Sequence, residues 1–203
     1  MKVMFNIIIS LFIIGLIFFL ISCKNKKDGA VTNNSPIKPD NNIKNTQPKE
    51  NIYHDLRQLA FNITPEQLKV PISKDSNKIY GVIMDWSLPP EGIATLVSFE
   101  TGEASMYLST GGGFIGGGQH ENVKEVVKKY IALAQKYFDK TSKTDTTLLP
   151  DKDCVKFYLL TNKGKFVAQE KMINIENESS DWLELFEEAN KVITVLRDIS
   201  PKK

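Results

Sequence analysis

A cluster of glycines is the part of this sequence most suited to binding a ligand. Residues 109–120 read Ser-Thr-Gly-Gly-Gly-Phe-Ile-Gly-Gly-Gly-Gln-His, and six of the chain's twelve glycines fall within 111–118. Glycine is entropically costly to fix, so a cluster indicates backbone shapes that other side chains would block. A glycine loop before a helix start can offer unpaired amides and a favourable dipole to an anion. The candidate ligand-binding residues are Gly111, Gly112, Gly113, Gly116, Gly117, Gly118 and His120.

The same segment also allows a purely structural interpretation. No Gly-Lys-Ser/Thr follows it, so it is not a P-loop, and the GxGxxG match at 111–116 arises in any glycine run. The strand before it belongs to a predicted hairpin and not to a βαβ unit. On this interpretation the segment is a tight crossover close to the sheet, with Phe114 and Ile115 tucked into the core.

His120 is the residue around which a catalytic site can be drawn. It would act as a general base, with Ser109 or Thr110 as the nucleophile and Asp85 orienting the imidazole ring. This arrangement describes a small hydrolase. Asp85 is also expected at the end of an apolar strand, where it would accept backbone hydrogen bonds.

Metal binding and helix capping are the other possibilities for His120. A metal would need His120, Glu121 and Asp85 together, and His54 is the one further histidine in the sequence, so a multi-histidine site is not expected. Side chains at a helix start more often serve the helix: His120 or Gln119 as the cap, and Glu121 as a complement to the dipole. We therefore expect no metal and no cofactor, and a binding module more readily than an enzyme.

Hydrophobic periodicity predicts the elements that would position these residues. Helical spacing indicates three helices, and alternating or β-rich runs indicate strands. The first helix carries Ile52, Leu56, Leu59 and Ala60 on one side, and a short second helix is predicted to start at Thr64. The expected order is helix, three strands, helix, two strands, helix, over residues 52–61, 79–86, 93–99, 103–109, 120–138, 155–161, 165–170 and 181–198.

This order predicts an α+β domain. Both strand sets are connected by hairpins, so the sheet of about five strands is expected to be antiparallel, with amphipathic helices packed against it. The expected organisation is a signal peptide over 1–22, a lipidated cysteine and disordered tether over 23–51, and a single domain over 52–203.

The N-terminus predicts export and lipidation. A short basic start precedes an apolar run over 7–21, which is short for a transmembrane helix and typical of a secretory signal. Leu20-Ile21-Ser22-Cys23 resembles the lipobox of bacterial lipoproteins, which implies that Cys23 carries diacylglycerol and further acyl chains such as palmitate. Multiple chains hold a protein firmly to a membrane. The expected location is the cell envelope, anchored to a membrane and facing away from the cytoplasm.

Composition narrows the possible partners. Residues 24–50 are rich in Asn, Lys, Pro and Asp and lack the apolar residues needed to form a core. The formal net charge is only +2, so a nucleic-acid surface is not expected. The membrane is one predicted partner, and the other is either a protein or a small anionic ligand.

Several stretches of residues 79–197 also resemble a family of uncharacterised bacterial proteins with an LSTGGGxIGGGxH-type glycine motif. The matching stretches include Ile79-Tyr80-Gly81-Val82-Ile83-Met84-Asp85-Trp86, the segment from Ala104 through His120, and Val155-Lys156-Phe157-Tyr158-Leu159-Leu160-Thr161. The resemblance implies no activity, cofactor or catalytic residue. The sequence therefore predicts a lipid-anchored binding module, with a small hydrolase or an envelope assembly module as alternatives.

Overall fold

The computed structural model describes residues 49–71 and 77–200. All of them belong to the unit Gln47–Lys203. The predicted signal peptide, the lipidation site Cys23 and nearly all of the predicted tether lie outside the described residues. Among the described helices, none has both the length and the apolar character needed to cross a membrane.

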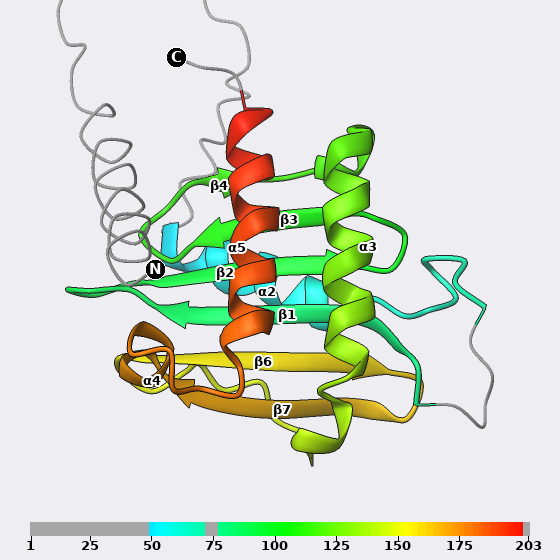
Figure 1. Ribbon diagram of the computed structural model, residues 1–203. Helices are drawn as coiled ribbons and strands as arrows, with labels where there is room; N and C mark the ends of the chain where they lie inside the picture. Colours follow the sequence, from blue (N-terminus) through cyan, green and yellow to red (C-terminus); the bar gives the residue numbers. More distant parts are fainter. Residues whose placement is uncertain (1–48, 72–76, 201–203) are drawn as a thin grey trace, which may run out of the picture. The chain divides into compact units, whose positions relative to one another are not determined.

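The domain is α+β, as predicted, and is built on one antiparallel sheet of seven strands (Figure 1). The spatial order is β4-β3-β2-β1-β6-β7-β5, so the first strands of the two hairpin sets, β1 and β6, pair at the centre. The strands are β1 Ile79–Ser87, β2 Ile93–Phe99, β3 Ala104–Leu108, β4 Gly113–Phe114, β5 Ser142–Thr144, β6 Cys154–Thr161 and β7 Gly164–Lys171.

Two long helices cover one face of the sheet, and a third lies behind the other face (Figure 1). The covering pair is α3, Glu121–Gln135, and α5, Leu183–Asp198, while α2, Lys49–Phe61, occupies the opposite face. Edge-to-face packing of Trp86 on Phe186 joins β1 to α5, with ring centroids 5.3 Å apart. Because side chains alternate along a strand, the neighbouring residue Asp85 faces α2.

Helical periodicity predicted the buried faces of α3 and α5 well. The α3 residues Val123, Val127, Tyr130 and Ala134 are fully buried. In α5, the residues Leu185, Phe186, Ala189, Ile193 and Leu196 repeat at helical spacing and are all buried, and Val192 joins them. Packing of these apolar stripes against the sheet supplies the main core.

The structure differs from the predicted order in its short elements. The two-residue β4 and three-residue β5 raise the strand number from five to seven, and the short helix α4, Met172–Glu176, precedes α5. Such pieces have too few residues to show a period. The second helix predicted from Thr64 is only a turn, in which Thr64 and Gln67 form reciprocal capping hydrogen bonds.

The buried face of α2 is also not the one expected. Ile52 and Leu59 are exposed, whereas Tyr53 and Arg57 are buried against the sheet beside Ala60. The apolar pattern alone could not identify this face, because the charged Arg57 finds its partner on β1, a strand distant in the sequence.

Candidate functional site

The glycine segment forms a hairpin and a crossover. The Gly111 amide donates to the Leu108 carbonyl at 2.9 Å, and the Leu108 amide donates to the Gly112 carbonyl at 3.1 Å, which closes the turn between β3 and β4. Gly113 then pairs with Tyr107, and the Gly116 amide donates to the Ser105 hydroxyl at 3.4 Å. The Gly111 and Gly116 amides therefore have acceptors inside the protein.

Close packing explains two of the glycines directly. Gly113 has φ +150°, and an added Cβ would collide with the Met106 carbonyl oxygen. Gly117 is buried, and a Cβ there would meet the Leu196 side chain and, at 3.1 Å, the Ala104 carbonyl oxygen. This part of the segment therefore fits the structural interpretation.

The structural interpretation fails for Ile115. This side chain was expected in the core, yet it is 72% exposed, and Phe114 is only half-buried. The two-residue strand β4 lies at the sheet edge, and the chain leaves the sheet after Phe114. Ile115 therefore lies outside the sheet, and no helix or strand covers its side chain fully.

His120 and the proposed nucleophiles are not brought together. Ser109 follows the last residue of β3, whereas Gly117, whose carbonyl accepts from the His120 amide, packs close to Ala104, the first residue of β3. Five residues of strand span about 17 Å. The Ser109 hydroxyl also accepts a hydrogen bond from the Ile93 amide at 2.8 Å. Ser109 and His120 therefore do not form a nucleophile–base pair in this structure.

The start of α3 is a poor anion site. His120 holds the N-cap position, but its side chain makes no capping hydrogen bond. Glu121 in the first turn favours the helix dipole and pairs with Lys124 at 3.1 Å. Its carboxylate would repel a bound anion.

Asp85 belongs to a buried hydrogen-bonded network. It is fully buried, and the Arg57 Nη2 and Nε atoms donate to its Oδ2 atom at 2.5 and 3.1 Å. The Thr95 hydroxyl donates to the Oδ1 atom at 2.5 Å and lies 2.8 Å from the Tyr53 hydroxyl. The prediction that Asp85 accepts backbone hydrogen bonds at a strand end is therefore wrong. A sequence signal existed in Arg57, an arginine on the apolar side of a predicted helix, but its partner required the tertiary structure.

This environment changes the acid–base properties of the nearby groups. Burial raises the pKa of the Tyr53 hydroxyl, and the negative charge of Asp85 raises it further. Burial likewise raises the pKa of Tyr158 to about 12, again with a contribution from Asp85. Burial lowers the pKa of Arg57, but the hydrogen bonds and charge of Asp85 outweigh this effect and raise it overall. The network therefore consists of the Arg57–Asp85 ion pair and the neutral hydroxyl groups of Tyr53 and Tyr158.

A groove with a mainly apolar lining lies on the α2 face of the sheet. Its larger hollow, of about 280 Å³, lies between α2 and the strands β2 and β3 with the glycine segment, and a smaller one of about 110 Å³ continues it beside Tyr53. Leu56 and Tyr107 line both hollows. We call the two together the α2–β3 groove.

Exposed apolar side chains gather around this groove. Five large hydrophobic residues are strongly exposed in the described part of the chain, and three of them line the groove: Ile115 at 72%, Leu59 at 62% and Ile52 at 48%. Single exposed hydrophobic residues are ordinary, but a cluster around a hollow marks an interaction surface. Glu103 is the only charged residue in the lining.

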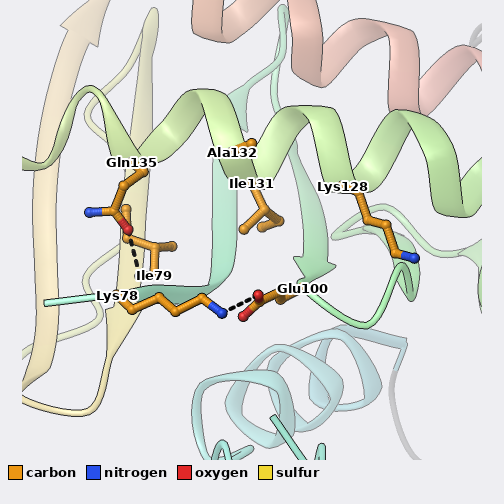
Figure 2. A pocket seen from close by; sticks show the side chains of 7 residues that line it. All are labelled: Lys78, Ile79, Glu100, Lys128, Ile131, Ala132 and Gln135. Carbon is orange, nitrogen blue, oxygen red and sulfur yellow. Dashed lines mark hydrogen bonds and ion pairs between the residues drawn. The ribbon is translucent and has the colours of Figure 1, made fainter. Parts of the chain in front are cut away.

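A second recess lies beside α3 (Figure 2). It measures about 570 Å³, and its polar groups bond mainly to one another. Lys78 forms an ion pair with Glu100, and the Gln135 amide group accepts from the Ile79 amide at 2.9 Å and donates to the Asn77 carbonyl at 3.3 Å. Lys128 stands apart from this pair (Figure 2). These bonds serve the fold, so the recess is a weaker candidate than the groove.

Neither composition nor comparison assigns a chemistry to the domain. Within the described residues, no three His, Cys, Asp or Glu side chains are arranged to hold a metal ion. Comparison with family models, with curated proteins and with solved structures finds no match to the chain.

Proposed function

We propose that this protein is a lipid-anchored binding module of the bacterial cell envelope, and that its α2–β3 groove binds a segment of another protein. The observation that carries the proposal is the exposed Ile115, held at the groove by the glycine segment. A fixed backbone means that little conformational entropy is lost when this side chain is buried by a partner. Exposed apolar anchors beside a pocket are typical of protein interfaces.

The lining favours a particular partner chemistry. Aliphatic and aromatic side chains dominate the groove, and its one charged group, Glu103, is negative. A nucleotide or another phosphorylated ligand would find no cation there. The fitting occupant is a protein segment that presents aliphatic or aromatic side chains without net negative charge. This apolar lining supports an envelope assembly module better than a module that binds a small anion.

The membrane anchor rests on the sequence of the N-terminus. The Leu20-to-Cys23 motif supports lipidation, and the tether predicted over residues 23–51 would separate the lipid from the domain. The domain would thus sample partners close to the membrane, where a tether raises their effective concentration.

Site-specific photocrosslinking in the native host tests the proposal. A benzophenone amino acid replaces Ile115 in the full-length chain, and the matched control replaces Ile173, an equally aliphatic residue that is 53% exposed on α4 and lies outside the groove. We expect a discrete protein adduct from position 115 that is absent from position 173 and disappears when Leu59→Asp is added. Adducts with lipid alone, with a second copy of this chain, or equally from both positions would contradict the proposal.

A further inference from the structure

Besides apolar packing, a directional polar contact holds helix α2 on the sheet. The Arg57 guanidinium makes two-nitrogen contact with the Asp85 carboxylate, and its Nη1 atom donates to the Thr147 carbonyl at 2.8 Å. The guanidinium carbon also lies 4.8 Å from the centre of the Phe61 ring and 5.9 Å from that of Tyr158. One side chain therefore fixes α2 against β1, against β6 and against the segment before β6.

Stability alone does not account for a charge pair at this position. Arg57 is 5% exposed and Asp85 is fully buried, so both ions have lost most of their hydration. A buried ion pair is often no more stabilising than apolar residues of similar volume. The remaining residues beneath α2, including Ile83, Val97 and Phe99, could hold a wholly apolar helix by themselves.

An ion pair of this geometry does supply a defined position. Apolar contacts are non-directional, so a helix held by them alone can shift or rotate at small cost. The guanidinium fork matches a carboxylate in one orientation, and its hydrogen bonds weaken steeply with misalignment. The second contact, from Tyr53 through Thr95 to Asp85, lies one helical turn away and fixes the rotation of α2 as well.

The position of α2 determines the shape of the groove. Leu56 and Leu59 flank Arg57 in the sequence and form the helical wall of the larger hollow, and Tyr53 lines the smaller one. We infer that the Arg57–Asp85 pair is a positioning device: it sets the register of α2 over the sheet and thereby the width of the α2–β3 groove. Its importance for binding rests on the function proposed above.

The test separates position from stability. In the full-length chain with Cys23→Ala and Cys154→Ser, spin labels at Gln58, exposed on α2, and at Lys143, exposed on β5, report the distance between helix and sheet. We expect a single narrow distribution for this parent. The double variant Arg57→Met, Asp85→Leu should retain or increase the urea midpoint of unfolding and yet give a broad or split distribution.

Further variants keep the inference falsifiable. The single variants Arg57→Met and Asp85→Leu each leave a buried charge without its partner and should lower the urea midpoint of unfolding. Arg57→Lys keeps the positive charge but loses the two-nitrogen geometry of the guanidinium, so it should broaden the distance distribution in a protein that still folds. A double variant with a narrow distribution, or with a midpoint as low as the single variants, overturns the inference. If the double variant does not fold, Arg57→Lys with a narrow distribution overturns it. The distance measurement needs no binding partner. The positioning role of the Arg57–Asp85 pair can therefore be supported even if crosslinking finds no partner for the groove, and crosslinking can find a partner even if the positioning role is refuted.

Discussion

The glycine segment shows how residues that look alike in sequence have different roles. The cluster predicted an unusual backbone, and positive φ values at Gly111, Gly112, Gly113 and Gly116 bear out that part of the prediction. Which glycine is essential depends on what surrounds it, and that is set by Met106, Ala104 and Leu196. These neighbours come from β3 and α5 and cannot be read from the segment itself.

Alanine substitution should therefore separate these glycines. Gly116→Ala introduces a side chain at φ +82° with nothing within 4 Å, so we expect a loss of about 1 kcal/mol in the free energy of unfolding. Gly113→Ala and Gly117→Ala also force backbone or core atoms apart and should each cost more, about 3 kcal/mol. Urea unfolding of the three variants measures the difference, and equal losses at all three positions would argue against the close packing described.

Buried tyrosines should make the protein sensitive to alkali. Tyr158 has its pKa raised from 10.0 to about 12 by burial and by Asp85, and Tyr53 is shifted in the same direction. Between pH 10 and about pH 12, the Tyr158 hydroxyl loses its proton in the unfolded chain but keeps it in the folded chain. The free energy of unfolding is therefore at its full value below pH 10 and decreases as the pH rises above it. The slope per tyrosine approaches about 1.4 kcal/mol per pH unit.

Urea unfolding between pH 9 and pH 12 measures this effect. Tyr158→Phe removes one titrating group and should reduce the slope by up to one proton, and Tyr53→Phe should do the same. A free energy of unfolding with the same pH slope in all three proteins would contradict the assignment.

Among the elements, those with a long apolar period were predictable and those defined by tertiary partners were not. The strands β1, β2, β6 and β7 and the helices α3 and α5 agree with the sequence to within a few residues. The edge strands β4 and β5 exist because they pair with β3 and β7. The buried face of α2 was predicted wrongly because it was taken to be the side with the most apolar residues. The charged Arg57 is buried instead, while Ile52 and Leu59 are exposed.

The exposed side of α2 should contribute to binding and little to stability. Leu59→Ser removes an apolar side chain that is already 62% exposed, so we expect a change in the free energy of unfolding within about 0.5 kcal/mol. Ala60→Asp, at the neighbouring buried position, is the control and should cost more because it places a charge in the apolar core. Thermal or urea unfolding that ranked the two variants the other way would contradict the orientation of α2.

For the whole molecule, the sequence predicted the α+β class of fold, but not the binding surface. The catalytic set Ser109, Thr110, His120 and Asp85 was a pattern of residue types. In the structure the Ser109 hydroxyl bonds to the Ile93 amide, Asp85 pairs with Arg57, and His120 begins α3. The groove could not be predicted, since it joins α2 to residues about 50 positions later.

Lipidation makes a prediction for the full chain in cells. Cys23→Ala removes the sulfur that would carry diacylglycerol, so incorporation of labelled palmitate should be lost and the protein should be left unanchored or unprocessed. Cys154→Ala is the control, because this thiol is buried within the domain. Continued labelling of the Cys23 variant would refute the lipoprotein assignment.

The central claim is that the α2–β3 groove is a protein-binding site anchored on Ile115. Its most direct test is the dissociation constant of the complex between this protein and the partner identified by crosslinking at position 115, measured with both proteins purified. Ile115→Asp places a charge in the apolar interface and should weaken binding at least tenfold, about 1.4 kcal/mol. Ile173→Asp, on α4 outside the groove, should leave the constant unchanged. Equal affinities for the parent and the Ile115 variant would contradict the account.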